Sequence, residues 1–272
     1  MNSSNYFPPS FILLQQEGHM LSSCLSSGLT DLRAAHVHNK GGIYSSLFNL
    51  SIGIERLLKA IVIMEHMLNN KLTVPTKKQL KAYGHNINDL YDTCKSIADK
   101  RNVKLRDRNA LNNINQDILN LLNDYANTAR YHNLDSLSQS HSNKDPLEHW
   151  GEIMIAILYK DVSENQRTKI ISQASAIANA IGGITMTVRQ GLDKRSLTTE
   201  ESLVLPALHD QSTKHAVLRV ITILTPFREL ISTLSHEAYG LGGSQPPFPQ
   251  MHEFIEWMWD DRQYVLRKKK WP

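Results

Sequence analysis

Three short segments of the sequence place polar side chains inside strongly apolar, helix-like surroundings. The first, GIERLLK, contains Glu55 and Lys59, an acid and a base four positions apart. On a helix, this spacing and order forms an exposed ion pair worth about 0.2–0.5 kcal/mol. Alternatively, Glu55 lies at the inner edge of a helix bundle and pairs with a base or an arginine from another helix. Both interpretations are open at this point.

The second segment, YGHNINDL, reads as a turn followed by the start of a helix. Gly84 is followed by two polar residues and then by an amphipathic run, which predicts an N-cap close to His85. His85 either caps this helix or points into a cleft beside the helix that carries Glu55. A histidine in a cleft would change its charge near neutral pH.

The third segment, ARYHNLD, closes a long amphipathic run. Arg130 at a helix C-terminus would satisfy the last carbonyls, and Asn133 and Asp135 are common turn formers. In the functional alternative, the guanidinium N–H groups of Arg130 bind a phosphate. Tyr131 then stacks on the ligand, and His132 gains or loses a proton near neutral pH. Composition does not choose between the two.

Familiar catalytic and metal-binding motifs are missing from the sequence. There is no H-E-x-x-H, C-x-x-C, G-x-x-x-x-G-K-[ST], G-x-G-x-x-G or G-x-S-x-G pattern. Cys24 and Cys94 are too few for a disulfide framework or a thiolate zinc site. His36 and His38 are two positions apart and would face away from each other on a helix. We therefore expect neither a metal site nor a cofactor.

The elements that must position these residues are helices. Apolar residues recur at helical spacing in most of the chain, whereas no clear period-2 strand is present. The nearest strand candidate, residues 184–188, lies inside a longer helical run. The fold class is therefore all-α, an antiparallel helical bundle with a helical C-terminal extension. The predicted helices span residues 9–36, 42–69, 84–100, 108–130, 147–159, 164–190, 212–238 and 250–268.

The most polar connection, SLSQSHSNKDP at residues 136–146, marks the expected boundary between two regions. Residues 1–140 would form the helical bundle, and residues 141–272 a helical region packed on it. Breaks are also expected at residues 191–202 and 240–249. Because no long flexible linker separates the two regions, we expect them to share one hydrophobic interface.

Composition and charge narrow the function classes. The 272 residues are 41% hydrophobic and 21% charged, as in an ordinary folded protein, and 30 basic against 26 acidic residues give a net charge of +4. Arg267, Lys268, Lys269 and Lys270 account for that whole excess, which argues against a broad nucleic-acid footprint. This basic end could contact RNA phosphates, or it could complete an amphipathic helix with solvated lysines.

The sequence also contains no segment expected to enter a membrane. The N-terminus lacks the basic start of a secretory signal, and the most apolar stretch, residues 57–65, is far shorter than the roughly 20 residues of a membrane span. We therefore expect a cytoplasmic protein without a membrane partner.

The order of LFNLSIGIERLLKAI, YGHNINDLY and ARYHNLD over residues 40–140 resembles the HEPN superfamily (higher eukaryotes and prokaryotes nucleotide-binding). The resemblance implies a bundle of four or five helices, a homodimer, and a role in toxin–antitoxin or phage-defence systems. It also implies RNA or a partner protein as the binding partner.

Active HEPN members are metal-independent endoribonucleases with an R-x(4–6)-H motif at a cleft between two subunits. Arg130 matches the arginine of that motif, but His132 follows two residues later and His141 eleven residues later, and His85 belongs to the GH phrase. A HEPN-like binding module without an intact catalytic motif is therefore the leading hypothesis, and an endoribonuclease with a composite site at a dimer cleft is the alternative.

Both hypotheses expect polar residues from distant segments to meet at one pocket. The catalytic candidates are Arg130, His132, His85 and Glu55, and the binding candidates are Lys59, Tyr131, Asn133 and Asp135.

Overall fold

The protein folds into an all-α structure. The computed structural model describes residues 7–106, 111–138, 144–181, 184, 187–242 and 246–272. Within these residues, extended pairing is limited to an isolated antiparallel bridge between Gln190 and Ser196. The predicted fold class is confirmed.

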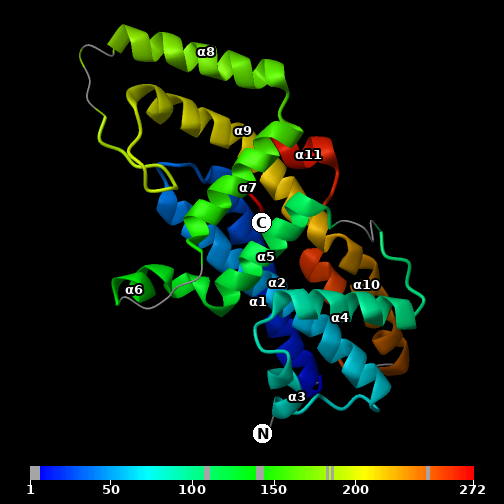
Figure 1. Ribbon diagram of the computed structural model, residues 1–272. Helices are drawn as coiled ribbons and strands as arrows, with labels where there is room; N and C mark the ends of the chain where they lie inside the picture. Colours follow the sequence, from blue (N-terminus) through cyan, green and yellow to red (C-terminus); the bar gives the residue numbers. More distant parts are fainter. Residues whose placement is uncertain (1–6, 107–110, 139–143, 182–183, 185–186, 243–245) are drawn as a thin grey trace, which may run out of the picture.

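The helices are connected by segments of different lengths, of which the one between α8 and α9 is the longest (Figure 1). They are α1 (Pro9–Ala34), α2 (Lys40–Asn69), α3 (Lys77–Ala82), α4 (Ile87–Lys100), α5 (Asn113–Asn127), α6 (His132–Leu137), α7 (Pro146–Asp161), α8 (Glu164–Ile181), α9 (Thr199–Leu224), α10 (Pro226–Gly242) and α11 (Arg262–Arg267), with the 3-10 helices η1 (Ala129–Tyr131) and η2 (Met251–Ile255).

The long helices α1 and α2 form an antiparallel pair at the centre of the fold. They approach each other closely at Gly28 and Gly53. A Cβ atom on Gly53 would lie 2.8 Å from Cγ of Leu25 and 3.1 Å from its backbone nitrogen. The Ser46 hydroxyl donates a hydrogen bond of 3.1 Å to the carbonyl of Gly28. Small residues therefore set the spacing of the two central helices, both of which contribute side chains to the core.

Substitution of Gly53 by alanine tests this close approach. We expect Gly53→Ala to lower the free energy of unfolding by about 1–3 kcal/mol, because the added methyl group overpacks a tight contact with Leu25. Gly41 on the same helix is the matched control, since a Cβ there meets no atom within 4 Å. Urea denaturation of both variants measures the difference, and equal stabilities for the two variants would contradict a tight contact at Gly53.

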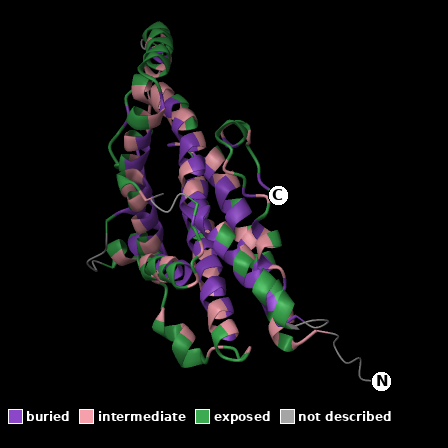
Figure 2. Ribbon diagram, turned by 90° about the vertical axis from the view of Figure 1, so that its right-hand side faces the viewer, coloured by how far each residue is buried: buried purple, intermediate pink, exposed green. Residues whose placement is uncertain are grey.

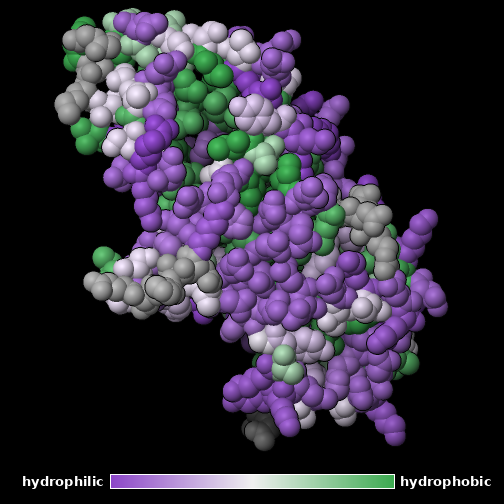
Figure 3. Space-filling model, in the orientation of Figure 1, coloured by the Kyte–Doolittle hydropathy of each residue, from purple (hydrophilic) through white to green (hydrophobic). Residues whose placement is uncertain are grey.

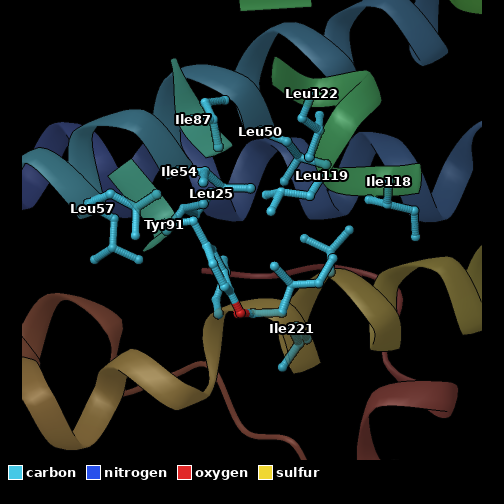
Figure 4. Close-up of a cluster of buried hydrophobic side chains, with 14 of the residues drawn as sticks. Leu25, Leu50, Ile54, Leu57, Ile87, Tyr91, Ile118, Leu119, Leu122 and Ile221 are labelled. Atoms are coloured by element: carbon cyan, nitrogen blue, oxygen red, sulfur yellow. The ribbon is translucent and has the colours of Figure 1, made fainter. Parts of the chain in front are cut away.

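One hydrophobic core joins the two predicted regions of the chain. Side chains from α1, α2, α4, α5 and α9 meet in it (Figure 4), and buried residues follow the central helices (Figure 2). Tyr91 of α4 donates a hydrogen bond of 3.0 Å to the carbonyl of Ile223, and its ring lies edge-on to Phe227 at 4.8 Å. Residues of the C-terminal region thus complete the packing of the N-terminal helices.

Two predicted helices are interrupted in the structure. The predicted helix 212–238 is two helices, α9 and α10, because Pro226 has no N–H to donate to the preceding turn. The start of α9 is earlier than predicted, since Thr198 and Glu201 form a capping box inside the expected break. The predicted helix 250–268 is likewise split into η2 and α11, and Asp261 caps α11 by accepting the N–H of Tyr264 at 2.6 Å.

Other boundaries differ by a few residues. The helix predicted from residue 108 begins at Asn113, with Asn112 as its cap, and the helix predicted to end at residue 190 ends at Ile181. Residues 108–110, 182–183 and 185–186, which those predictions include, lie outside the described residues. The short helices α3 and α6 were not predicted, because six residues give too few turns for a periodic pattern.

Helix α8 lies at one end of the molecule and packs on α9 (Figure 1). Only Ala174 and Ala178 of its described side chains are buried. Figure 3 shows hydrophobic side chains gathered around α8 and α9, whereas hydrophilic side chains cover most of the rest of that face. Among the helices that the structure describes, none combines the length and apolar character needed to cross a membrane.

Candidate functional site

A pocket of about 380 Å³ opens where the middle of α2 faces the turn between α3 and α4. We call it the α2 pocket. Glu55, Lys59, His85 and Arg130, which the sequence analysis expected to meet, all line it. Its complete lining is Leu14, Glu17, Ile52, Glu55, Arg56, Lys59, Ala60, Ile63, Leu80, His85 and Arg130.

Glu55 is the centre of the polar wall of the α2 pocket. Lys59 donates to its Oε1 at 2.6 Å, and Nδ1 of His85 lies 3.1 Å from both of its carboxylate oxygens. Only 15% of the Glu55 side chain is exposed, compared with 57% for His85. Glu55 therefore does more than form an exposed ion pair with Lys59, because it also contacts His85 from a segment 30 residues away.

The turn that carries His85 is built by its neighbours. Gly84 has a φ of +52°, in the left-handed region that favours glycine, and its carbonyl accepts a hydrogen bond of 2.6 Å from Lys59. Asn86 caps α4 by accepting the N–H of Asp89 at 3.1 Å. The cap is thus the residue after His85, which leaves the imidazole side chain to point at Glu55.

Arg130 lies in η1, directly after α5. The end of α5 is tied to the α3–α4 turn, because the Asn127 side-chain amide donates to the carbonyl of His85 at 3.3 Å. The guanidinium of Arg130 lies 5.1 Å from the centre of the Tyr131 ring. Within the described part of the chain, no carboxylate lies within ion-pair distance of Arg130. Arg130 is exposed and remains a cation with hydrogen-bond donors available.

The charges around the α2 pocket leave a positive excess. Glu17 forms an ion pair with Arg56, and Glu55 forms one with Lys59. Each of these two pairs is neutral. Arg130 therefore supplies one net positive charge, and a protonated His85 would add a second. The other lining residues, Leu14, Ile52, Ala60, Ile63 and Leu80, are apolar. A pocket with this division suits an anionic ligand that also has a hydrophobic part.

His132 lies outside the lining of the α2 pocket and belongs to a separate buried cluster. Its side chain is nearly buried, and its Nε2 is 3.6 Å from Oδ2 of Asp145. Asp145 caps α7 by accepting the N–H of Leu147 at 2.8 Å and accepts a hydrogen bond from Lys194 at 2.8 Å. The cluster therefore ties α6, the start of α7 and the segment after α8 together.

The environment of Asp145 favours its charged form. Burial alone raises the pKa of this carboxyl, but hydrogen bonds from the Lys194 ammonium and the Leu147 N–H outweigh burial and hold the pKa below its usual value. The pKa of Lys194 is raised by the same hydrogen bond. Such a mutual stabilisation is the signature of a structural ion pair.

The remaining candidate residues lie beside this cluster. Asn133 donates a hydrogen bond of 3.0 Å to the hydroxyl of Tyr44, and the backbone carbonyl of Asp135 accepts one of 2.9 Å from Ser138. Tyr131 is exposed and contacts Arg130. Of the eight candidates, four line the α2 pocket. Tyr131, His132, Asn133 and Asp135 are not among its lining residues, although Tyr131 contacts Arg130. His141 lies outside the described residues.

Two residues of the α2 pocket were missed by the sequence analysis. Glu17 lies in α1, and only the antiparallel pairing of α1 with α2 brings it to Arg56. No local pattern around Glu17 signals this partner. Arg56, in contrast, adjoins Glu55 in the segment already singled out, and its position could have indicated a role at the same site.

The histidines of the chain do not form a metal centre in the described residues, where no group of three metal-binding side chains is arranged to hold an ion. His36 and His38 stand with their ring centres 6.1 Å apart, and His38 instead contacts the carbonyl of Ser202 at 3.0 Å. Burial, together with the nearby His36 and His38, lowers the pKa of His209 to about 4. A neutral, half-buried His209 fits a packing role.

The chain was compared with protein-family models, with curated proteins and with solved structures, and no match was found in any of the three comparisons.

Proposed function

We propose that this chain is a HEPN-like helical binding module whose α2 pocket binds the phosphate backbone of RNA. The observation that carries the proposal is the convergence of Glu55, Lys59, His85 and Arg130 from three separate segments on one pocket. Residues on independent surface faces would have no reason to share a pocket. These residues come from the same three sequence segments on which the resemblance to the HEPN superfamily is based.

The chemistry of the α2 pocket favours a phosphate ester. A guanidinium binds two phosphate oxygens through parallel N–H donors, and Arg130 has this group available at the pocket. The apolar lining residues, among them Leu14, Ile63 and Leu80, can cover a sugar or base next to that phosphate. A single strand of RNA offers both parts in an accessible form.

A metal-independent endoribonuclease is the second candidate, and the Glu55–His85 pair favours it. Glu55 at Nδ1 fixes the orientation of the imidazole and leaves Nε2 as the proton acceptor. His85 would take the proton of a 2′-hydroxyl, the 2′-oxygen would attack the phosphorus, and the 5′-oxygen would leave and take up a proton from solvent. Arg130 would stabilise the negative charge on the phosphate.

Replacement of His85 by glutamine separates the two candidates. If the protein is an enzyme, we expect His85→Gln to lower RNA turnover about 100-fold or more, because general acid–base catalysis contributes about 10²–10⁴-fold. RNA affinity should change little, since glutamine keeps a polar side chain beside Glu55. Turnover of labelled single-stranded RNA in the presence of a metal chelator is the measurement.

The outcomes of this experiment are distinct. If the wild-type protein binds RNA and leaves it intact, the binding module stands and the enzyme candidate fails. If His85→Gln cleaves RNA as fast as the wild-type protein, His85 is not the proton acceptor. If the wild-type protein neither binds nor cleaves RNA, both candidates fail.

A further inference from the structure

The last residues of the chain carry four consecutive cations in a fixed position. Arg267, Lys268, Lys269 and Lys270, which we call the C-terminal basic segment, lie between two buried anchors. Val265 is 0% exposed and Trp271 is 8% exposed. The backbone N–H of Trp271 also donates a hydrogen bond of 3.0 Å to Oγ1 of Thr30 in α1. The segment is therefore held against the core at both of its ends.

The cations of this segment lack close carboxylate partners among the described residues. Within the described residues, none of the four cations forms an ion pair with a carboxylate, although the other basic side chains of the fold form several. Lys268 instead contacts the hydroxyl of Tyr264 and lies 4.7 Å from the centre of its ring. Four adjacent uncompensated charges repel one another, and a bound polyanion would relieve that repulsion.

A shallow hollow lies beside the segment. It has a volume of about 560 Å³ and is lined by Asp261, Gln263, Tyr264, Arg267, Lys268 and Lys270. Asp261 caps α11 and contributes one negative charge to this lining, against the three cations Arg267, Lys268 and Lys270. The partly exposed Tyr264 places an aromatic ring among the cations, which is the combination that single-stranded nucleic acids bind, through phosphate contacts and base stacking.

We propose that the C-terminal basic segment is a second nucleic-acid-binding surface, which takes the phosphate backbone of a single strand and stacks a base on Tyr264. An anionic membrane is a poorer fit, because the apolar residues that flank this segment, Val265 and Trp271, are buried in the core and cannot insert into lipid. The proposal shares no residue with the α2 pocket and goes beyond the function proposed for it.

The salt dependence of RNA binding tests this surface. The variant Arg267→Gln, Lys268→Gln, Lys269→Gln, Lys270→Gln keeps both anchors, so its fold should persist, and its thermal unfolding checks this. Each phosphate contact contributes roughly 0.7 to the slope of log affinity against log salt for a single strand, so four contacts contribute about 3. We expect the slope for a 20-nucleotide single-stranded RNA to become shallower by about that amount in the variant, with affinity about tenfold lower or more at low salt.

A matched control removes the same charge elsewhere. Lys100, Lys104, Lys160 and Lys169 are exposed and scattered, and their joint replacement by glutamine should leave the slope nearly unchanged. The proposal is overturned if the basic-segment variant binds RNA as the wild-type protein does, if the control loses as much, or if the wild-type protein does not bind RNA. It is also overturned if the variant loses only its binding to vesicles of phosphatidylserine and phosphatidylcholine. If the basic-segment variant keeps the wild-type slope while Arg130→Ala weakens RNA binding, the basic segment is not a binding surface. The function proposed for the α2 pocket is then unaffected.

Discussion

The Arg130→Ala variant is expected to bind a short single-stranded RNA about 10- to 100-fold more weakly than the wild-type protein. A hydrogen bond to a charged group contributes about 1.5–3 kcal/mol, and a tenfold change in affinity corresponds to about 1.4 kcal/mol. Arg130 is exposed and has no carboxylate partner among the described residues, so its removal leaves no buried carboxylate without a partner. The melting temperature should therefore stay the same, and fluorescence anisotropy measures the affinity.

Two further variants control this result. Arg130→Lys keeps the charge but loses the fork of donors, so it should recover only part of the affinity. Lys169→Ala removes an exposed cation that does not line the α2 pocket and should have almost no effect. Equal affinities for wild-type and Arg130→Ala would show that RNA does not use the α2 pocket.

The Asp145→Ala variant is expected to lower the free energy of unfolding by about 2 kcal/mol at neutral pH, without the loss of RNA affinity predicted for Arg130→Ala. It removes the side-chain cap of α7, which contributes about 0.5–2 kcal/mol, and leaves Lys194 without its carboxylate. Lys194 is itself largely exposed, so its lost partner adds little, since water can solvate the freed ammonium. Chemical denaturation at several pH values measures the effect.

The pH dependence of this effect has a defined sign. The pKa of Asp145 is lower in the folded protein than its ordinary value of 3.8. Its contribution to stability is therefore fully present above about pH 4 and is lost as the pH falls through the folded-state pKa. The stability difference between wild-type and Asp145→Ala should shrink in that acidic range. A difference that grows on acidification, or a loss of RNA binding in Asp145→Ala, would contradict a purely structural role.

The elements of the α2 pocket could be predicted because its main residues interrupt strong local patterns. Glu55 stands in an apolar helix, His85 follows a glycine at a helix start, and Arg130 closes an amphipathic run. A polar residue in such a setting is unusual enough to be visible without a structure. The periodic pattern also gave the two longest helices of the N-terminal region nearly to their ends.

The unpredicted parts depend on long-range packing or on single residues that override a pattern. Glu17 reaches the α2 pocket only through the pairing of α1 with α2, and Lys194 reaches Asp145 across 49 positions of sequence. Pro226 divides a helix whose apolar periodicity continues on both sides. His132 was a candidate alongside His85 in sequence, but it is buried beside Asp145, the N-cap of α7, in a structural cluster.

The position of an RNA phosphate in a crystal structure with a short 2′-O-methyl oligonucleotide, which cannot be cleaved through its 2′-oxygen, would decide whether the α2 pocket is the binding site. We predict a phosphate oxygen about 2.7–3.2 Å from the Arg130 guanidinium, with His85 still paired to Glu55. An oligonucleotide bound elsewhere on the protein, with no phosphate at Arg130, would contradict the role proposed for this pocket.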